Sequence, residues 1–203
     1  MFNIFQTAIF LTMGCTAFSA TIDYSVLSPR NDYGAVVAGD GNKADLALSY
    51  RTLNPDFSIA SSRVSFWNTG YSDLAAALFA DFNGGIMEIT LTPIGNNTVT
   101  LNSFMLGSYF GGPARTASVF RVTDGTTTLW SSEPYNYALN ASAAVINVGV
   151  SASQLRLLVG TDWNLGVNLL DYTTRGENSA IPEPSSAFLV LGASALLFKL
   201  RRR

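Results

Sequence analysis

The sequence contains no histidine and one cysteine, and only 13% of its 203 residues are charged. Without histidine, Ser-His-Asp and Cys-His catalytic groups and most zinc sites are excluded. Because Cys15 has no second cysteine to pair with, no disulfide forms within the chain, and a folded domain must be held together by packing. Carboxylate chemistry is the main catalytic option that these absences leave open.

The acidic residues do not point to a particular catalytic pair. A glycosidase needs two carboxylates at a defined separation, and no spacing in this sequence singles out two. The sequence therefore favours a non-catalytic protein, and a carboxylate-based glycoside-active enzyme is kept as an alternative. The candidate carboxylates are Asp73, Asp81, Glu88, Asp124, Asp162 and Asp171.

Basic residues are also sparse outside the C-terminus. Setting aside the four cations among the last five residues and Glu183 leaves 8 of 12 basic and 13 of 14 acidic residues, a charge near −5. No basic run is present that could follow a phosphate backbone, so we expect no binding to nucleic acid. The scattered basic residues include Arg51, Arg63, Arg115 and Arg156.

The last 22 residues combine three distinct segments. Pro182-Glu183-Pro184 is an extended breaker, because proline fixes φ and disfavours helix in the residue before it. The uncharged apolar run from Ala187 to Phe198 is shorter than the ~20 residues of a typical membrane helix, so it spans with help from its flanks. The terminal cations orient this helix with its C-terminus in the cytoplasm and the preceding chain across the membrane. These cations are Lys199, Arg201, Arg202 and Arg203.

This order of triplet, apolar segment and terminal arginines closely resembles the PEP-CTERM sorting signal of Gram-negative bacteria, over residues 182–203 only. The resemblance implies recognition of Pro182, Glu183 and Pro184 by an exosortase, a membrane-embedded cysteine transpeptidase that cuts near the triplet. It also implies retention by Arg201–Arg203 and an association with exopolysaccharide and biofilm systems. The expected precursor is anchored in the inner membrane with a periplasmic body, which then reaches the cell surface or the extracellular space.

The N-terminus agrees with export. Residues 4–18 form an apolar stretch of signal-peptide type, although the first three residues carry no lysine or arginine. Ala17 and Ser19 are small residues at positions −3 and −1 of a cut before Ala20, and a cut after Ala20 is an alternative. We therefore expect a signal peptide over 1–20, processed by signal peptidase after Sec export. A lipoprotein signal with lipid on Cys15 stays open as a second interpretation.

The body, residues 21–173, shows the period-two alternation of β-strands. Met87, Ile89 and Leu91 alternate with polar residues, as in a half-buried antiparallel strand. About ten short strands at such spacing predict an all-β, two-sheet antiparallel sandwich with jelly-roll connections, followed by a linker over 174–181. Together with its ends, the chain is expected to add a signal-peptide helix and one C-terminal transmembrane helix.

The sequence pattern also predicts the positions of individual strands. In the last one, Trp163, Leu165, Val167 and Leu169 are expected on one face. A slip in the apolar register predicts a bulge or bend near residues 102–104. Residues 74–82 are compatible with a short helix or a strand. Further strands are expected at 46–53, 58–67, 118–122, 127–130, 145–150 and 155–159.

One loop offers oxygen ligands for a cation. Asp40, Asn42 and Asp45 lie within six residues, a density that calcium sites use. However, Lys43 lies among them and no bidentate Glu follows at the twelfth position. A solvated turn is the favoured interpretation, and no cofactor is required by the sequence.

Aromatic residues provide the other opening for function, because exposed rings stack on sugars. The main hypothesis is a non-catalytic cell-surface or matrix protein, and the alternative is a carbohydrate-binding module acting on exopolysaccharide. Packing in the core or at its rim is the competing explanation for each ring. The candidate glycan contacts are Tyr109, Trp130, Tyr135 and Tyr137.

Replacing Pro182-Glu183-Pro184 with three alanines should abolish processing of the tail in a host that contains the exosortase. Mass spectrometry of the mature C-terminus measures the result: the wild-type protein should lose its apolar segment, whereas the variant should keep it. If both proteins keep the segment, the sorting hypothesis is wrong.

Overall fold

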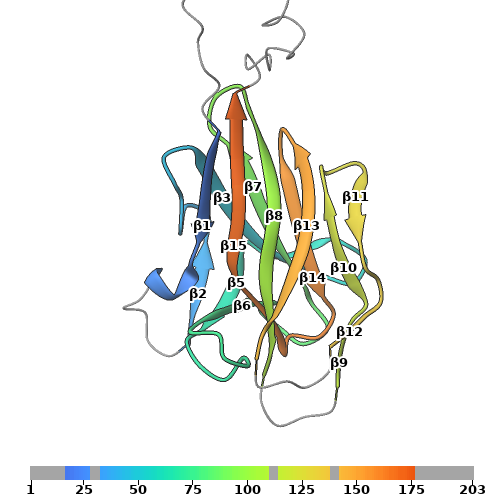
Figure 1. Ribbon diagram of the computed structural model, residues 1–203. Helices are drawn as coiled ribbons and strands as arrows, with labels where there is room; N and C mark the ends of the chain where they lie inside the picture. Colours follow the sequence, from blue (N-terminus) through green and yellow to red (C-terminus); the bar gives the residue numbers. More distant parts are fainter. Residues whose placement is uncertain (1–16, 28–32, 110–113, 138–141, 177–203) are drawn as a thin grey trace, which may run out of the picture.

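The computed structural model describes residues 17–27, 33–109, 114–137 and 142–176 (Figure 1). The expected C-terminal sorting segment and almost all of the expected signal peptide, including Cys15, lie outside these ranges. Within the described ranges, no helix is both long and apolar enough to cross a membrane.

Almost all of the regular secondary structure in the described ranges is antiparallel β-strand, as predicted (Figure 1). Sheet A has the order β13 (Ala144–Ala152), β8 (Asn97–Ser108), β15 (Leu165–Gly176), β6 (Ala77–Phe79), β5 (Arg63–Trp67) and β2 (Tyr33–Val37), and β1 (Phe18–Ile22) also pairs with β15. Sheet B has the order β11 (Thr128–Ser131), β10 (Val119–Thr123), β14 (Leu155–Gly160), β7 (Ile86–Pro93), β3 (Leu46–Leu53) and β4 (Ile59–Ser61). A short ladder joins β12 (Tyr135–Tyr137) to β9 (Arg115–Ala117), and one 3₁₀ turn, η1, covers Tyr24–Leu27.

The main hydrophobic core lies between the two sheets. Met87, Ile89 and Leu91 of β7 are buried in it as predicted, but Glu88 and Thr90 between them are buried as well, so the strand is not half-exposed. Across the core, Phe104 of sheet A meets Phe120 of sheet B edge to face, with ring centroids 5.8 Å apart. Packing between the sheets therefore holds this cysteine-poor body together.

Two predicted segments differ in detail from the strands that form. The strand expected over 58–67 is two strands, β4 in sheet B and β5 in sheet A, because the chain crosses between the sheets at Ser62. The ambiguous segment 74–82 contains a strand, β6, and no helix. The expected irregularity near 102–104 is present, since the register of β8 against β15 shifts between Leu101 and Ser103.

The last strand departs from simple alternation at a bulge. Leu165 and Val167 are buried as predicted, but Leu169 has φ of 49° and is only partly buried, and Leu170 points into the core in its place. One extra residue reverses which side chains face inward. Trp163, expected on the inner face, precedes the strand and is exposed.

The same bulge is where β15 changes partners. Before it, Val167 pairs with β6, and after it, residues 170–174 pair with β1. Asn168 is buried at the junction, and its Oδ1 accepts hydrogen bonds from the backbone N–H of Tyr24 (2.8 Å) and of Leu169 (2.7 Å). This side chain therefore satisfies backbone donors where neither ladder is continuous.

The two ends of the body lie side by side. In the β1–β15 ladder Phe18 is opposite Thr174, so the chain enters and leaves at one pole of the sandwich, here called the terminal pole (Figure 1). β1 begins inside the segment expected as signal peptide, and β15 runs to Gly176, three residues into the expected linker. Pairing between these strands extends the ordered body at both ends.

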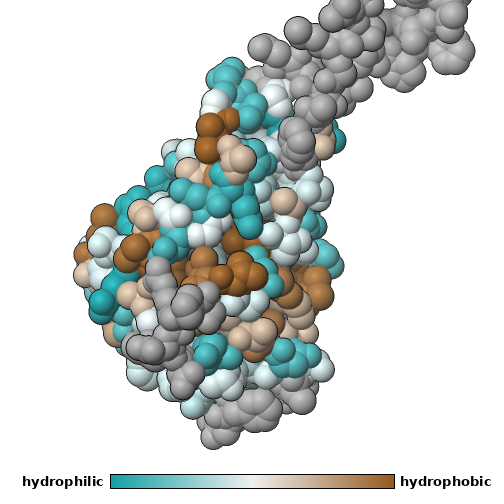
Figure 2. Space-filling model, turned by 90° about the vertical axis from the view of Figure 1, so that its left-hand side faces the viewer, coloured by the Kyte–Doolittle hydropathy of each residue, from teal (hydrophilic) through white to brown (hydrophobic). Residues whose placement is uncertain are grey.

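The outer surface is mixed in polarity. Seen from the side of β1 and β2, hydrophilic and weakly polar atoms dominate, with apolar patches scattered across the middle of the body (Figure 2). Apolar atoms are common on the surface of any folded protein, so specific sites have to be located from individual residues.

Two tyrosines form a buried pair under η1. The rings of Tyr24 and Tyr50 meet edge to face at 6.2 Å, and their hydroxyl oxygens are 3.4 Å apart. The Tyr50 hydroxyl donates to the carbonyl oxygen of Asp40 at 2.8 Å. Burial is the main cause that raises the pKa of Tyr24 well above its usual value, and burial likewise raises that of Tyr50.

Replacing Tyr24 with Phe should reduce the sensitivity of stability to alkali. Because the folded-state pKa lies above the unfolded value of about 10, the stability linked to this group is intact below pH 10 and is lost as the pH rises above it. Urea midpoints at pH 8 and pH 11 should therefore differ less for Tyr24→Phe than for the wild type. Phe66→Leu changes the core without involving an ionisable group and is the control. It should lower the free energy of unfolding by the same amount at both pH values. If the urea midpoint falls by the same amount between pH 8 and pH 11 in Tyr24→Phe and in the wild type, ionisation of Tyr24 does not limit stability in alkali.

Candidate functional site

Three of the four predicted glycan contacts are packing residues. Trp130 and Tyr135 are partly buried, and their rings pack on Phe120 with centroid distances of 5.3 Å and 4.8 Å. Tyr137 is buried, and its hydroxyl donates to the carbonyl oxygen of Ser142 at 3.0 Å. The competing explanation of rim and core packing accounts for their positions.

Tyr109, the fourth candidate, lies in a pocket lined mainly by aromatic side chains. This aromatic pocket has a volume of about 320 Å³, near the lower end of the range for small-ligand sites. It lies where several strands of sheet A end or begin, at the pole opposite to the terminal pole. Its lining residues are Trp67, Tyr71, Phe79, Tyr109, Trp163 and Asn164.

Ring contacts fix the floor of the aromatic pocket. Tyr109 lies 5.4 Å from Trp67 and 5.5 Å from Tyr71 between ring centroids, and Tyr71 stacks on Phe79 at 5.3 Å. Trp67 of β5 is opposite Ala77 of β6, and Phe79 is two residues further along β6, while a single β-bridge joins Tyr71 to Tyr109. The pairing of β5 with β6 and this bridge therefore set the spacing of these rings.

Hydrogen bonds attach the rim of the pocket to its floor. The Tyr71 hydroxyl donates to the carbonyl oxygen of Trp163 at 2.8 Å, and the Tyr109 N–H donates to that of Asn164 at 2.8 Å. The Asn164 backbone N–H and Nδ2 both donate to Asp162 Oδ1, at 3.0 Å and 2.9 Å. The turn that carries Trp163 is thus held in place before any ligand binds.

The pocket combines the groups that sugar binding uses. Trp163 is 39% exposed, so part of its indole is accessible to a ligand. Aromatic faces stack on the apolar faces of pyranose rings, and a few polar groups such as Asn164 fix orientation through hydroxyls. The geometry suits a neutral sugar unit bound at one end of the sandwich.

Sequence reasoning identified one member of the pocket and missed most of the others. Trp67 and Tyr71 flank the turn residues 68–70, and a pair of aromatics around a turn was the only local signal. Trp163 was assigned to the same strand face as Leu165 because it lies two residues before it, which is the spacing of side chains on one face of a strand. Assembly of the pocket depends on strand pairings that are distant in sequence.

The predicted cation loop is stabilised by its own hydrogen bonds. Asp40 Oδ2 accepts from the Val37 N–H and Asn42 Oδ1 from the Leu48 N–H, at 2.9 Å and 2.7 Å. Asp45 accepts from the hydroxyls of Tyr172 (3.0 Å) and Thr174 (2.6 Å), which links the start of sheet B to β15. No cluster of three or more potential metal-ligating residues occurs in the described part of the chain.

The six candidate carboxylates each have different partners. Asp81 pairs with Arg63 at 2.9 Å, and Glu88 lies beside Arg51 at 3.4 Å. Asp73 accepts from the Ala143 N–H, Asp124 from the Thr126 and Thr127 N–H groups, Asp162 from Asn164, and Asp171 lies 3.4 Å from Asn102 Nδ2. These contacts do not bring any two of the six carboxylates together.

Comparisons with known proteins give no family assignment. No protein-family model matches the chain, and neither the curated proteins nor the solved structures contain a significant match.

Replacing Gly70 with Ala should distort the aromatic pocket. Gly70 has φ of +86°, and an added Cβ would lie 2.8 Å from Tyr109 Cε2, so the ring must move. Gly84→Ala is a matched control, because Gly84 has φ of +89° and open space around an added Cβ. Both variants should lose about 1–2 kcal/mol from the left-handed backbone, and Gly70→Ala a further ~1–3 kcal/mol from overpacking.

Urea unfolding and the near-ultraviolet circular dichroism of the aromatic side chains measure these effects. Only Gly70→Ala should change the aromatic signal. Indistinguishable stabilities and spectra for the two variants would show that Tyr109 is not held against the Gly70 turn.

Proposed function

We propose that this chain is an exported, non-catalytic cell-surface or matrix protein that binds carbohydrate through its aromatic pocket. The observation that carries the carbohydrate part is the half-accessible Trp163 above a floor of Trp67, Tyr71 and Tyr109. The expected sorting tail and leader support the export part.

The placement of the pocket supports a tethered binding protein. β15 runs from Leu165, next to the pocket, to Gly176 at the terminal pole. A 12-residue strand spans about 35–40 Å, so the pocket is separated from the chain ends by the length of the sandwich. A body attached to a membrane or matrix through its tail would present the pocket outward, toward polymers around the cell.

The connections between strands support a jelly-roll arrangement of the sandwich. Successive strands repeatedly change sheet, as in the path from β6 through β7 and β8 to β10. Jelly rolls are common among lectin-type domains, which use their end loops or sheet faces for ligands. A fold of this kind hosts many functions, so the proposal depends on the pocket itself.

Replacing Trp163 with Ala should weaken glycan binding by about tenfold or more, because a partly exposed aromatic anchor is lost. A glycan array followed by titration with the best neutral oligosaccharide measures the change. Val145→Ala, which removes an exposed apolar side chain from β13, is the control and should leave binding unchanged.

Two results would contradict the carbohydrate proposal. Absence of retention on every glycan would leave a purely structural matrix role. Equal affinities for the wild type and Trp163→Ala would place any binding elsewhere on the protein.

A further inference from the structure

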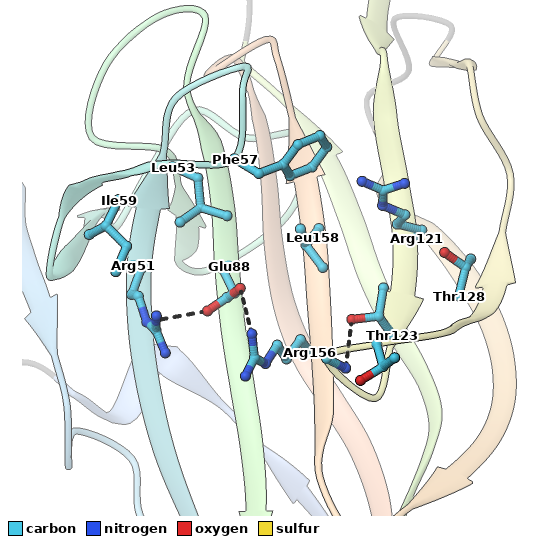
Figure 3. Close-up of a pocket in the computed structure, with 12 residues that line it drawn as sticks. Arg51, Leu53, Phe57, Ile59, Glu88, Arg121, Thr123, Thr128, Arg156 and Leu158 are labelled. Atoms are coloured by element: carbon cyan, nitrogen blue, oxygen red, sulfur yellow. Dashed lines mark hydrogen bonds and ion pairs between the residues drawn. The ribbon is translucent and has the colours of Figure 1, made fainter.

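A second pocket lies on the outer face of sheet B (Figure 3). It shares no lining residue with the aromatic pocket. It has a volume of about 300 Å³. We call it the arginine pocket. Its charged and aromatic lining residues are Arg51, Phe57, Glu88, Arg121 and Arg156.

Strand register gathers the charged residues from four separate strands, and Phe57 comes from the turn between β3 and β4. Arg51 of β3 is opposite Glu88 of β7, Glu88 is opposite Leu158 of β14, and Leu158 is opposite Arg121 of β10. Side chains in one such row project from the same face. Three strand spacings of about 4.8 Å place Arg51 and Arg121 about 14 Å apart, with Arg156 in the adjacent row.

The lining carries more positive than negative charge. Three arginines surround one carboxylate, Glu88, whose side chain is 5% exposed. Arg51 Nε lies 3.4 Å from Glu88 Oε1, and Arg156 Nη1 lies 4.0 Å from Oε2. Both contacts are longer than a strong charge-assisted hydrogen bond. Arg156 Nε and Nη2 also donate to Gln154 Oε1, at 3.4 Å each, so Arg51 has more capacity for a further anion than Arg156 has.

Arg121 has a further unused donor. Its Nε is buried and makes no hydrogen bond to any described residue, and its ion-pair partner Glu133 is 3.6 Å away. Glu133 Oε1 accepts instead from the Phe120 N–H at 2.9 Å. A buried donor without a hydrogen bond costs free energy, so the ion pair with Glu133 does not fully satisfy this guanidinium group.

The acidic residues of the flanking turns are engaged within those turns. Hydrogen bonds from the Ser58 hydroxyl and N–H lower the pKa of Asp56, and the N–H groups of Thr127 and Thr126 lower that of Asp124. Both carboxylates are ionised and fully exposed, so water and salt screen their effect on the pocket.

An exposed aromatic wall completes the pocket. Phe57 is 44% exposed, and the guanidinium carbon of Arg121 lies 4.6 Å from its ring centroid. Phe57 has φ of 65°, a strained conformation for a residue with a side chain, and its N–H donates to the Asn54 carbonyl oxygen at 2.9 Å. Strain of this kind at a surface turn that presents an aromatic ring is a feature of ligand-binding sites.

We propose that the arginine pocket binds a carboxylate-bearing sugar ring of an acidic polysaccharide. The planar carboxylate matches the guanidinium fork of Arg121 or Arg51, and the Phe57 ring stacks on the apolar face of the sugar. Threonine hydroxyls at positions 123, 126 and 128 line the same pocket and suit sugar hydroxyls. The pocket lies open on a sheet face, which lets a long polymer pass across it.

The arginine pocket is separate from the aromatic pocket, so either binding proposal can be wrong without affecting the other. The test uses the full chain, with titration of a short oligogalacturonate at low salt and of the same oligomer with its carboxylates methyl-esterified. Wild-type protein should bind the acid form, more weakly as salt rises, and should bind the ester at least tenfold less tightly.

Arg121→Gln and Phe57→Ala should each weaken oligogalacturonate binding by about tenfold. Arg175→Gln removes the same charge from an exposed position at the end of β15, and it should leave binding unchanged. Trp163→Ala should also leave it unchanged, which separates this site from the proposed neutral-glycan site. Because Phe57 is in an exposed turn, Phe57→Ala should still fold, and it tests binding at the arginine pocket if Arg121→Gln does not fold.

Several results would overturn the proposal. These are no binding of oligogalacturonate by the wild type, equal binding of the ester, and equal losses for Arg121→Gln and Arg175→Gln. Tighter binding of a sulfated oligosaccharide or of an acidic peptide would assign the pocket to another class of anion.

Discussion

The pairing of β15 with three other strands is the interaction on which the rest of the body depends. One edge of β15 pairs with β8 along almost its full length, and the other pairs first with β6 and then with β1. The gap between β6 and β1 is closed by the Asn168 side chain, which holds η1 through the Tyr24 N–H. Because the body has no disulfide, no covalent cross-link secures this junction in addition to the hydrogen bonds of Asn168.

The two pockets result from different properties of the sandwich. The aromatic pocket forms where strands of sheet A end, so turns such as the one before β15 define its rim. The arginine pocket forms on strand faces, where cross-strand register sets the spacing of Arg51, Glu88 and Arg121. End loops can vary with little cost to the core, whereas a residue on a strand face is fixed by its neighbours.

The strands were predictable from sequence wherever alternation is undisturbed. β3 has the expected bounds, 46–53, because its whole length pairs with β7 in an unbroken register. Prediction failed at Leu169, where a bulge reverses the inward phase, and at Ser62, where the chain changes sheet. Neither event leaves a signal in period-two alternation.

The pockets were much less predictable. Tyr109 was one of four aromatic candidates, but Trp67 and Trp163, which line the same pocket, come from other parts of the chain. The arginines looked scattered because positions 51, 121 and 156 are far apart in sequence, and only the register of β3, β7, β14 and β10 brings them to one face. Long-range pairing cannot be inferred from local residue patterns.

The pairing of β1 with β15 also sets an order of events. Within the described chain the first strand pairs with the last one alone, so sheet A stays incomplete until residue 174 has been synthesised. The Ser19–Ala20 peptide bond ends up inside β1, opposite Thr173 and Tyr172 of β15. In the proposed export pathway, a cut at this bond would have to come before the sheet closes.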